Sequence, residues 1–347
     1  MRITSTRPCC DISSELHSLL VSAVVSSRPG TISRWDRNVA AFSAWALEDN
    51  VHVDFFLISF DNNASAWKDF ETRSPAGAVR HVVDASLEKR FHPKQYLQAL
   101  HLRRNGLAAR HRFLWFLDED IEINTKGFDL GDFFRRFACG FIEGTPLIAQ
   151  AQISPDTQAF HVMNHATFFR EAHKFFGADA RIPLITQSEY VEYQVPLVDA
   201  KFWLFFMDMI GATAAALDDI QETDWGIDAL WCGAAAYYAE RQMSGRRADR
   251  RPCALITLPL RHNQSSTIAH SSELINGGHA VRHWLTQNHV AFLQAGGEPV
   301  NKSWELGWQA LRRYKIQSGS SERHNLLQQL FSNSSARYEL ALPACPV

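Results

Sequence analysis

The sequence predicts an α/β fold in which helices cover both faces of a mostly parallel central sheet. Two observations lead to this expectation. Short runs that are apolar at every position recur along the chain, and segments with apolar residues at helical spacing follow them. A strand that is apolar on both sides has to be covered on both sides, and the helices of a parallel sheet provide that cover. The repeated order of strand and helix therefore favours a layered α/β protein.

Four strand-like runs lie in the first part of the chain. Each is rich in β-branched or aromatic residues and ends close to a polar residue or a turn, and they span 19–25, 53–60, 79–83 and 113–117. Trp35, Val39, Phe42 and Trp45 recur at helical spacing between the first two runs. A second helical pattern begins at Pro93, a residue that suits the first turn of a helix.

The later part of the chain continues the alternation and then changes. Further strands are expected at 147–153, 195–198 and 255–260, with helical patterns through 202–210 and 225–239. Beyond about residue 271 only helical patterns remain, at 279–295, 301–316 and 322–332. We therefore expect a flexible arm (1–17), an α/β domain (18–270), a C-terminal helical extension (271–333) and a tail (334–347).

The composition excludes several kinds of partner. The chain has 35 Lys and Arg against 37 Asp and Glu, so its formal charge is −2, which does not favour nucleic acid or an anionic membrane. No stretch reaches the roughly 18 consecutive apolar residues of a transmembrane segment, so a soluble chain is expected. The six cysteines do not indicate a disulfide scaffold, and we expect the adjacent Cys9 and Cys10 to be free thiols.

An acidic cluster, Asp118-Glu119-Asp120, directly follows the run 113–117. Ligands of a doubly wound sheet bind beyond the carboxyl ends of its strands, which is where this cluster is expected. In an extended chain Asp118 and Asp120 project to the same side, because side chains alternate. Two carboxylates there can hold one Mg²⁺ or Mn²⁺ that binds the phosphates of a ligand. The alternative is a turn whose acids only face water.

Two features further along the chain could complete such a site. Asp224 can cap the helix that follows it, and Asp228, four residues later on the same face, can act as a general base toward a hydroxyl group. His262 follows the run 255–260 and is a third candidate metal ligand. The alternatives are a solvated helix acid for Asp228 and a chance position for one of 15 histidines.

Several segments together resemble a known family. They are 66–71, 89–93, 113–120, 152–156, 191–197 and 225–228, in this order. They are similar to a plant-rich family of uncharacterised proteins labelled "lysine ketoglutarate reductase trans-splicing related", whose sequences in turn look like GT-A type glycosyltransferases. The resemblance implies a GT-A-like, Rossmann-like sheet and a metal-dependent transferase that moves a sugar from a nucleoside diphosphate to a hydroxyl acceptor. No GxGxxG motif follows a predicted strand, so a nicotinamide site is not expected.

The resemblance also implies roles on the donor side. Asp118 and Asp120 match the two acids of a DxD motif, with Asp120 the direct metal ligand and Asp118 at the ribose or the metal. Asp61 matches the acid that meets the nucleotide base or ribose, and Lys89 and Arg90 match a basic step that faces the diphosphate.

On the acceptor side, the resemblance makes Asp228, with Asp224 beside it, the candidate catalytic base. Glu192, Trp203 and Trp225 are expected to bind substrate, and His262 to stand at the place of a C-terminal metal ligand.

The chain departs from the family pattern directly before the acids. Trp115-Phe116-Leu117 stands where the family has Leu-Trp, and a shift of one residue would turn a carboxylate to the other face. Many relatives carry a membrane anchor that this chain lacks, so both cytoplasm and Golgi lumen stay open as compartments.

Two other function classes stay open at this stage. One is a non-catalytic module that binds a glycan or a nucleotide on the same fold, with its aromatic rings against sugars. The other is a histidine metalloenzyme, because His161 and His165, and also His279 and His283, are four residues apart and can share a helix face. Neither pair contains the glutamate of an HExxH motif.

Overall fold

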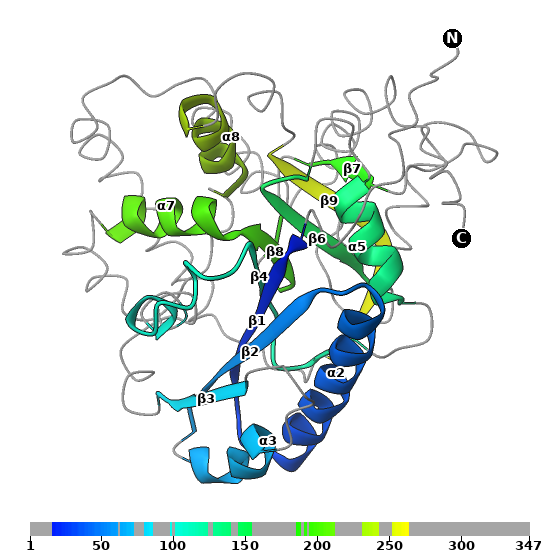
Figure 1. The fold of residues 1–347 in the computed structure, drawn as a ribbon, viewed down its shortest axis with the longest axis vertical. Coiled ribbons are helices and arrows are strands. Elements are labelled where there is room, and N and C mark those ends of the chain that lie inside the picture. The colour runs from blue at the N-terminus through cyan, green and yellow to red at the C-terminus, as the bar shows by residue number, and fades with distance from the viewer. Residues whose placement is uncertain are drawn as a thin grey trace, which may run out of the picture.

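The computed structural model describes residues 16–61, 63–72, 80–85, 98, 101–123, 128–139, 145–154, 185–188, 191–192, 194–211, 231–242 and 252–263. These segments form one sheet with helices against it (Figure 1). The predicted C-terminal extension and tail lie outside the described residues, as do residues 1–15 of the predicted arm.

Nine strands make up the sheet. They are β1 (Ser18–Val25), β2 (His52–Ser59), β3 (Arg80–Asp84), β4 (Phe113–Phe116), β5 (Ile121–Glu122), β6 (Ile148–Ile153), β7 (Ile185–Gln187), β8 (Pro196–Asp199) and β9 (Cys253–His262). Their order is β3-β2-β1-β4-β8-β6-β9-β5, and β7 pairs with β9. All seven strands predicted from the sequence are present, within two residues of the expected bounds at each end.

The sheet is mostly parallel, as predicted. Strands β3, β2, β1 and β4 pair in parallel, and so do β6 and β9. Strand β8 is antiparallel to both β4 and β6, so β6 and β9 run in the same direction as β1. The short strands β5 and β7 are antiparallel to β9. The carboxyl ends of β1, β2, β4, β6 and β9 therefore share one edge of the sheet.

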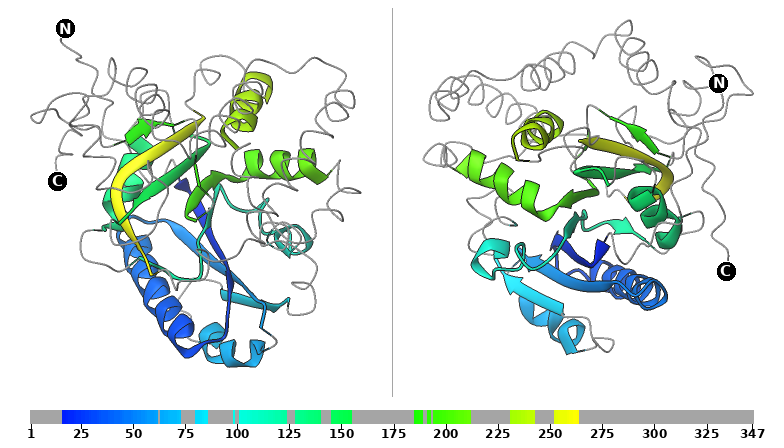
Figure 2. Two further views of the ribbon diagram at one scale, coloured as in Figure 1. Left: turned by 180° about the vertical axis from the view of Figure 1, so that it is seen from behind. Right: turned by 45° about the horizontal axis from the view of Figure 1, so that its top comes forward.

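Helices form a core on each side of the sheet. Their bounds are α2 (Pro29–Glu48), α3 (Lys68–Thr72) with the short η1 (Ala64–Trp67) before it, α5 (Leu130–Cys139), α7 (Ala200–Gly211) and α8 (Trp231–Gln242). Side chains of α2 and α5 belong to one core, and those of α7 and α8 to another. Figure 2 shows the two pairs of helices on opposite sides of the strands. The predicted α/β class is thereby confirmed.

Strand β1 shows why its sequence is apolar at nearly every position. Leu19 and Val21 belong to the core under α2, whereas Leu20 and Val24 belong to the core under α7. Side chains of a strand alternate between faces, so both faces of β1 are buried. The same holds for β4, where Trp115 stacks on Phe133 of α5 with ring centroids 4.7 Å apart.

Five elements were not predicted: η1, α3, α5, β5 and β7. The short η1 and α3 occupy residues 64–72, where no helix was expected. Helix α5 carries Leu130, Phe133, Phe134 and Phe137 at helical spacing, so its sequence does contain the signal. Strands β5 and β7 have two and three residues, which is too short for a periodicity. Their place is decided by pairing with β9.

The cysteine prediction is wrong for part of the chain. Cys232 of α8 and Cys253 of β9 form a disulfide, and Cys139 is disulfide-bonded as well. The separation of 21 residues in the sequence did not indicate this disulfide, because the two cysteines meet only when α8 packs on the sheet. Cys9 and Cys10 lie outside the described residues. Among the described helices, none has the length and apolar character that crossing a bilayer requires.

Candidate functional site

The acidic cluster begins two residues after the end of β4, at the carboxyl edge of the sheet. The backbone N–H of Leu117 donates to Ser22 of β1, and that of Asp118 donates to Gln194 before β8, both at 2.9 Å. The N–H of Ile121 then donates to the carbonyl of Asp118 at 3.1 Å, which closes a turn. Asp118 is thus held between the neighbouring strands, and the chain reverses into β5.

The acidic cluster leads directly into strand β5, which pairs with β9. Ile121 pairs with His262, and Glu122 pairs with Arg261. The N–H of Asn263 donates to the carbonyl of Asp120 at 2.9 Å. His262 therefore lies beside Asp120, although 142 positions separate them in the sequence.

The side chains of Asp118, Asp120 and His262 form one cluster. Nε2 of His262 lies 2.8 Å from Oδ1 of Asp120 and 3.9 Å from Oδ2 of Asp118. One ligand atom from each residue lies within 4.8 Å of the others. The histidine side chain is 2% exposed, whereas the two carboxylates are 21% and 19% exposed. The imidazole thus forms the floor of the cluster, and the carboxylates form its open side.

Glu119 points away from this cluster. Its carboxylate accepts a hydrogen bond from the N–H of Ser26 at 2.7 Å, and Arg34 donates to its carbonyl at 3.0 Å. Asp118 and Asp120 therefore both face His262 and Glu119 does not, as expected, but a turn orients them and not the alternation of an extended chain. The departure at Trp115-Phe116-Leu117 has not rotated the acids away from His262.

The three ligand types fit a divalent cation. Two carboxylate oxygens suit Mg²⁺ and Mn²⁺, and an imidazole nitrogen suits first-row transition metals better than Mg²⁺. In the described part of the chain, Nδ1 of His262 is buried without a hydrogen-bond partner. Only Nε2 thus has a polar environment, and it faces both carboxylates.

Asp61 lies at the same edge of the sheet, just after β2. Its carboxylate accepts hydrogen bonds from the N–H and the hydroxyl of Ser27, at 2.5 and 2.8 Å, and from the hydroxyl of Ser59 at 3.2 Å. Partial burial acts to raise the pKa of Asp61, but these hydrogen bonds outweigh it, and the pKa lies below its ordinary value of 3.8. Asp61 is therefore held as a carboxylate by Ser27. The preceding residue, Ser26, contacts Glu119.

A row of polar side chains lies beyond the acidic cluster, on β6 and before β8. The N–H of Glu192 donates to Oε1 of Gln150 at 2.6 Å, and Gln194 donates to the carboxylate of Glu192 at 3.2 Å. Gln152 follows Gln150 on the same face and is fully buried. Neither amide atom of Gln152 has a hydrogen-bond partner in the described part of the chain.

The structure thus brings four of the predicted residues to one edge: Asp61, Asp118, Asp120 and His262. Glu192 lies near them through Gln194, whose carbonyl accepts from Asp118. Trp203 does not line an open surface, because it is 4% exposed and packs against Phe116 in the core of α7.

Other predicted residues lie outside the described residues. They are Lys89, Arg90, Asp224, Trp225 and Asp228, and the histidine pairs His161 and His165, His279 and His283. Their roles stay predictions.

Two residues near the site were missed. Asn38 of α2 is fully buried and donates to the carbonyl of Ile121 while accepting from the N–H of Ile123, both at 2.9 Å. It shares a helix face with Trp35 and Phe42, so a polar residue in an apolar stripe was the available signal. Ser27, which holds Asp61, gave no signal beyond its place after a strand.

Comparisons with known proteins give similarity in structure only. No protein-family model and no curated protein sequence matches the chain. The mannosyltransferase PcManGT from Pyrobaculum calidifontis, in complex with GDP-Man and Mn²⁺, is 12% identical at a TM-score of 0.47, over 99% of this chain and 81% of that one. Mannosyl-3-phosphoglycerate synthase from Rubrobacter xylanophilus is 10% identical at 0.40, over 82% and 77%. Mouse xyloside xylosyltransferase 1 is 9% identical at 0.31, over 58% and 76%. Similarity at this level does not establish a shared function.

Proposed function

We propose that the protein is a glycosyltransferase that moves a sugar from a nucleoside diphosphate to a hydroxyl acceptor. The observation that carries this proposal is the cluster of Asp118, Asp120 and His262 at the carboxyl edge of the sheet, with Asp61 at the same edge. In a fold of this class, that edge is where ligands bind. Membership of the plant-rich family and the division into a catalytic domain and a helical extension belong to the same proposal.

In this proposal Asp118, Asp120 and His262 hold Mn²⁺ or Mg²⁺. When bound, the cation neutralises charge on the departing diphosphate. The imidazole ligand favours Mn²⁺ over Mg²⁺. The N–H of Ile121 and the pairing of β5 with β9 keep the carboxylates in place against His262, so little rearrangement is needed on binding.

The donor and the acceptor are assigned to different parts of the site. Asp61, held as a carboxylate by Ser27 and Ser59, is placed to accept hydrogen bonds from ribose hydroxyls. Asp228 remains our candidate for the base that takes the proton of the acceptor hydroxyl as its oxygen attacks the anomeric carbon and the nucleoside diphosphate leaves. Glu192 is our candidate for a contact on the acceptor side.

Nucleotide binding and turnover with and without metal test this proposal. We expect the full chain to bind UDP or GDP more tightly with Mn²⁺, and to release nucleoside diphosphate from one of a set of nucleotide sugars. Asp120→Asn should weaken Mn²⁺ binding by at least about tenfold and lower turnover in parallel. A matched control is Glu122→Gln, because Glu122 is two residues away but contacts Arg37 and Asn263 instead of His262.

Three outcomes are informative. Equal effects of Asp120→Asn and Glu122→Gln would show that the loss is not specific to the cluster. Metal-dependent nucleotide binding without turnover of any donor would favour the non-catalytic binding module. If no divalent metal promotes nucleotide binding to the intact protein, the proposal is wrong.

A further inference from the structure

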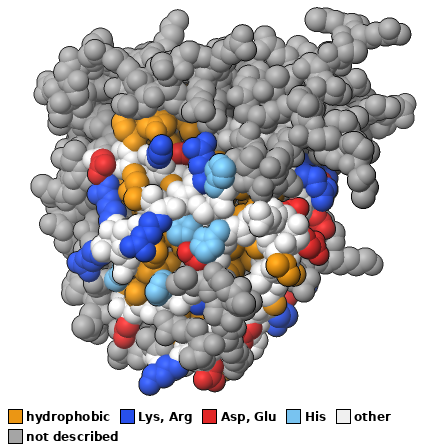
Figure 3. Space-filling view, in the orientation of Figure 1, with side chains coloured by type: hydrophobic (Ala, Val, Ile, Leu, Met, Phe, Trp, Pro, Cys, Tyr) orange, Lys and Arg blue, Asp and Glu red, His pale blue; other side chains and the backbone are white. Residues whose placement is uncertain are grey.

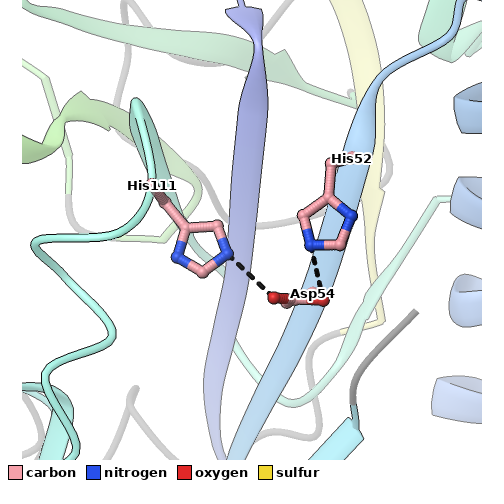
Figure 4. Close-up of side chains that lie close together, drawn as sticks. All are labelled: His52, Asp54 and His111. Atoms are coloured by element: carbon pink, nitrogen blue, oxygen red, sulfur yellow. Dashed lines mark hydrogen bonds and ion pairs between the residues drawn. The ribbon is translucent and has the colours of Figure 1, made fainter. Parts of the chain in front are cut away.

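A second cluster of potential metal ligands lies at the opposite end of the strands. It consists of His52 and Asp54 of β2 and of His111, which precedes β4 (Figure 4). Asp61 follows the carboxyl end of β2, and Asp118 follows that of β4, whereas this cluster lies at the amino ends of the same two strands. Seven residues separate His111 from Asp118, which corresponds to about 20 Å along an extended chain. The second cluster is therefore separate from the proposed transferase site.

The local structure brings the three side chains together across β1. His52 and Asp54 are two residues apart on β2, so both project from the same face. Strand β1 lies between β2 and β4, and pairs Leu20 with Asp54 and Leu19 with Phe113. Figure 4 shows His111 reaching from its loop toward Asp54 across the face of β1.

The distances define a compact set of donors. Nε2 of His52 lies 3.1 Å from Oδ1 of Asp54, and Nε2 of His111 lies 3.0 Å from Oδ2 of the same carboxylate. The two imidazole rings are nearly parallel, at an interplanar angle of 13°. The three ligand atoms lie within 4.8 Å of one another. Donors that share a tetrahedral Zn²⁺ with bonds of 2.0–2.1 Å lie about 3.3 Å apart, close to the two measured separations.

The contacts of His111 direct its Nε2 toward Asp54. Its Nδ1 lies 2.9 Å from the carbonyl oxygen of Leu107, which can only accept, so Nδ1 carries a proton. The other nitrogen, Nε2, lies 3.0 Å from Oδ2 of Asp54 and is therefore directed at an oxygen that can also bind a metal ion. An N–H held by a backbone carbonyl is also the usual arrangement of a histidine that binds a metal through its other nitrogen.

The carbonyl that holds His111 is itself fixed by a helix end. The N–H of Leu107 donates to Leu102 at 3.0 Å and that of Gly106 donates to Arg103 at 2.9 Å, a pairing that closes a helix in a Schellman motif. Gly106 has φ +61°, the left-handed conformation that this motif requires and that glycine adopts without strain. The orientation of the imidazole therefore does not depend on a flexible partner.

Burial gives the cluster both rigidity and an entrance. The side chains of His111 and Asp54 are 3% and 11% exposed, whereas that of His52 is 52% exposed. On the face seen in Figure 3, histidine side chains gather at the surface among Lys and Arg. A metal ion can thus reach a buried pair of ligands from solvent, with His52 free to adjust around it.

We propose that His52, Asp54 and His111 form a Zn²⁺ site that is independent of the transferase site and ties the loop before β4 to the start of β2. Two imidazoles and one carboxylate are ligands that Zn²⁺ prefers, and Mg²⁺ is poorly served by them. Water can complete the tetrahedron on the exposed side.

Zinc binding by the full, tag-free, oxidised chain tests this proposal. The variant Asp118→Asn with Asp120→Asn removes the other cluster and should still bind about one Zn²⁺ per chain after equilibrium dialysis, with a higher Tm when zinc is present. Adding His52→Ala should weaken zinc binding by at least about tenfold and abolish the rise in Tm. His81→Ala is the matched control, because His81 is an exposed histidine of the neighbouring strand β3 that is not part of the cluster.

His52→Gln gives a second test of similar size in case the alanine variant does not fold. Zinc retained by His81→Ala and lost by both His52 variants would support the site. Equal zinc affinity in all of these proteins, or no zinc in the double-asparagine variant, would overturn it.

Discussion

Replacing Asn38 by alanine should damage both the stability of the protein and its metal site. The amide of Asn38 bridges two backbone groups of the chain around β5, the carbonyl of Ile121 and the N–H of Ile123. The opposite edge of β5 pairs with β9, where Ile121 faces His262. Strand β5 is thus held by Asn38 on one side and by β9 on the other. Because β5 directly follows Asp120, both contacts position that carboxylate.

The magnitude follows from the number of groups left without a partner. Ile121 and Ile123 are 0% and 1% exposed, and Asn38 is fully buried, so solvent does not replace the amide directly. A buried polar group that loses its partner costs about 1–3 kcal/mol, which gives about 2–6 kcal/mol for two groups. A water molecule that enters the vacated space can recover part of this, so we expect a loss of roughly 3 kcal/mol.

Urea denaturation at neutral pH measures the stability change, and calorimetric titration with Mn²⁺ measures the effect on the site. The control is Asn105→Ala, because the side chain of Asn105 also donates to a backbone carbonyl, that of His101 at 2.8 Å, but the residue is exposed and makes one such bond. It should lose about 1 kcal/mol or less and leave Mn²⁺ affinity unchanged. If Asn38→Ala is no less stable than Asn105→Ala, or binds Mn²⁺ equally well, the positioning role assigned to Asn38 is wrong.

Three further changes test other parts of the structure. Replacing Cys232 and Cys253 by serine opens a 21-residue loop, so the free energy of unfolding should fall by about 3 kcal/mol and no longer respond to reductant at this bond; an equal response to reductant in both proteins would contradict the pairing. Because the pKa of Asp61 is lowered on folding, its carboxylate stabilises the protein above its ordinary pKa of 3.8, and this contribution is lost as the pH falls through the lower value. The stability difference between wild type and Asp61→Asn should therefore shrink below about pH 4, and a constant difference from pH 7 to pH 2 would count against the hydrogen bonds to Ser27. Phe42→Ala removes a fully buried ring that contacts Phe55 and Trp115 edge-on and should cost about 3–5 kcal/mol in urea denaturation, whereas a cost below about 1 kcal/mol would refute the packing described.

Most of the strands could be predicted because helices bury them on both faces. Phe113–Phe116 is apolar at every position, and that property is visible without knowing that Trp115 stacks on Phe133. The order of the strands was not predictable in the same way. Strand β8 lies between β4 and β6 and runs against both, which no local pattern indicates. Each strand could pair with several others, and which pairs form is decided only when the whole sheet packs.

The acids of the site were predictable for the same reason. Asp118 and Asp120 follow a buried strand, at the edge of the sheet where ligands bind, whereas the turn that directs both toward His262 was not predicted. The partner of each acid was harder to identify. His262 was one of 15 histidines, and the pairing of Ile121 with His262 depends on a two-residue strand that has no signal of its own. Asn38 and Gln152 are buried amides, and their roles depend on residues from distant parts of the chain that surround them.

The sequence by itself determined seven of the nine strands, the helices α2, α7 and α8, and the position of Asp118 and Asp120 after a buried strand. These properties arise from burial periodicity and from chain geometry over a few residues. Only the tertiary structure decided which acid meets which histidine, that Cys232 and Cys253 are joined, and that His52, Asp54 and His111 converge around one carboxylate. Such contacts form between segments far apart in the chain, and their geometry is decided by strand pairing and helix packing, which act on the whole molecule at once.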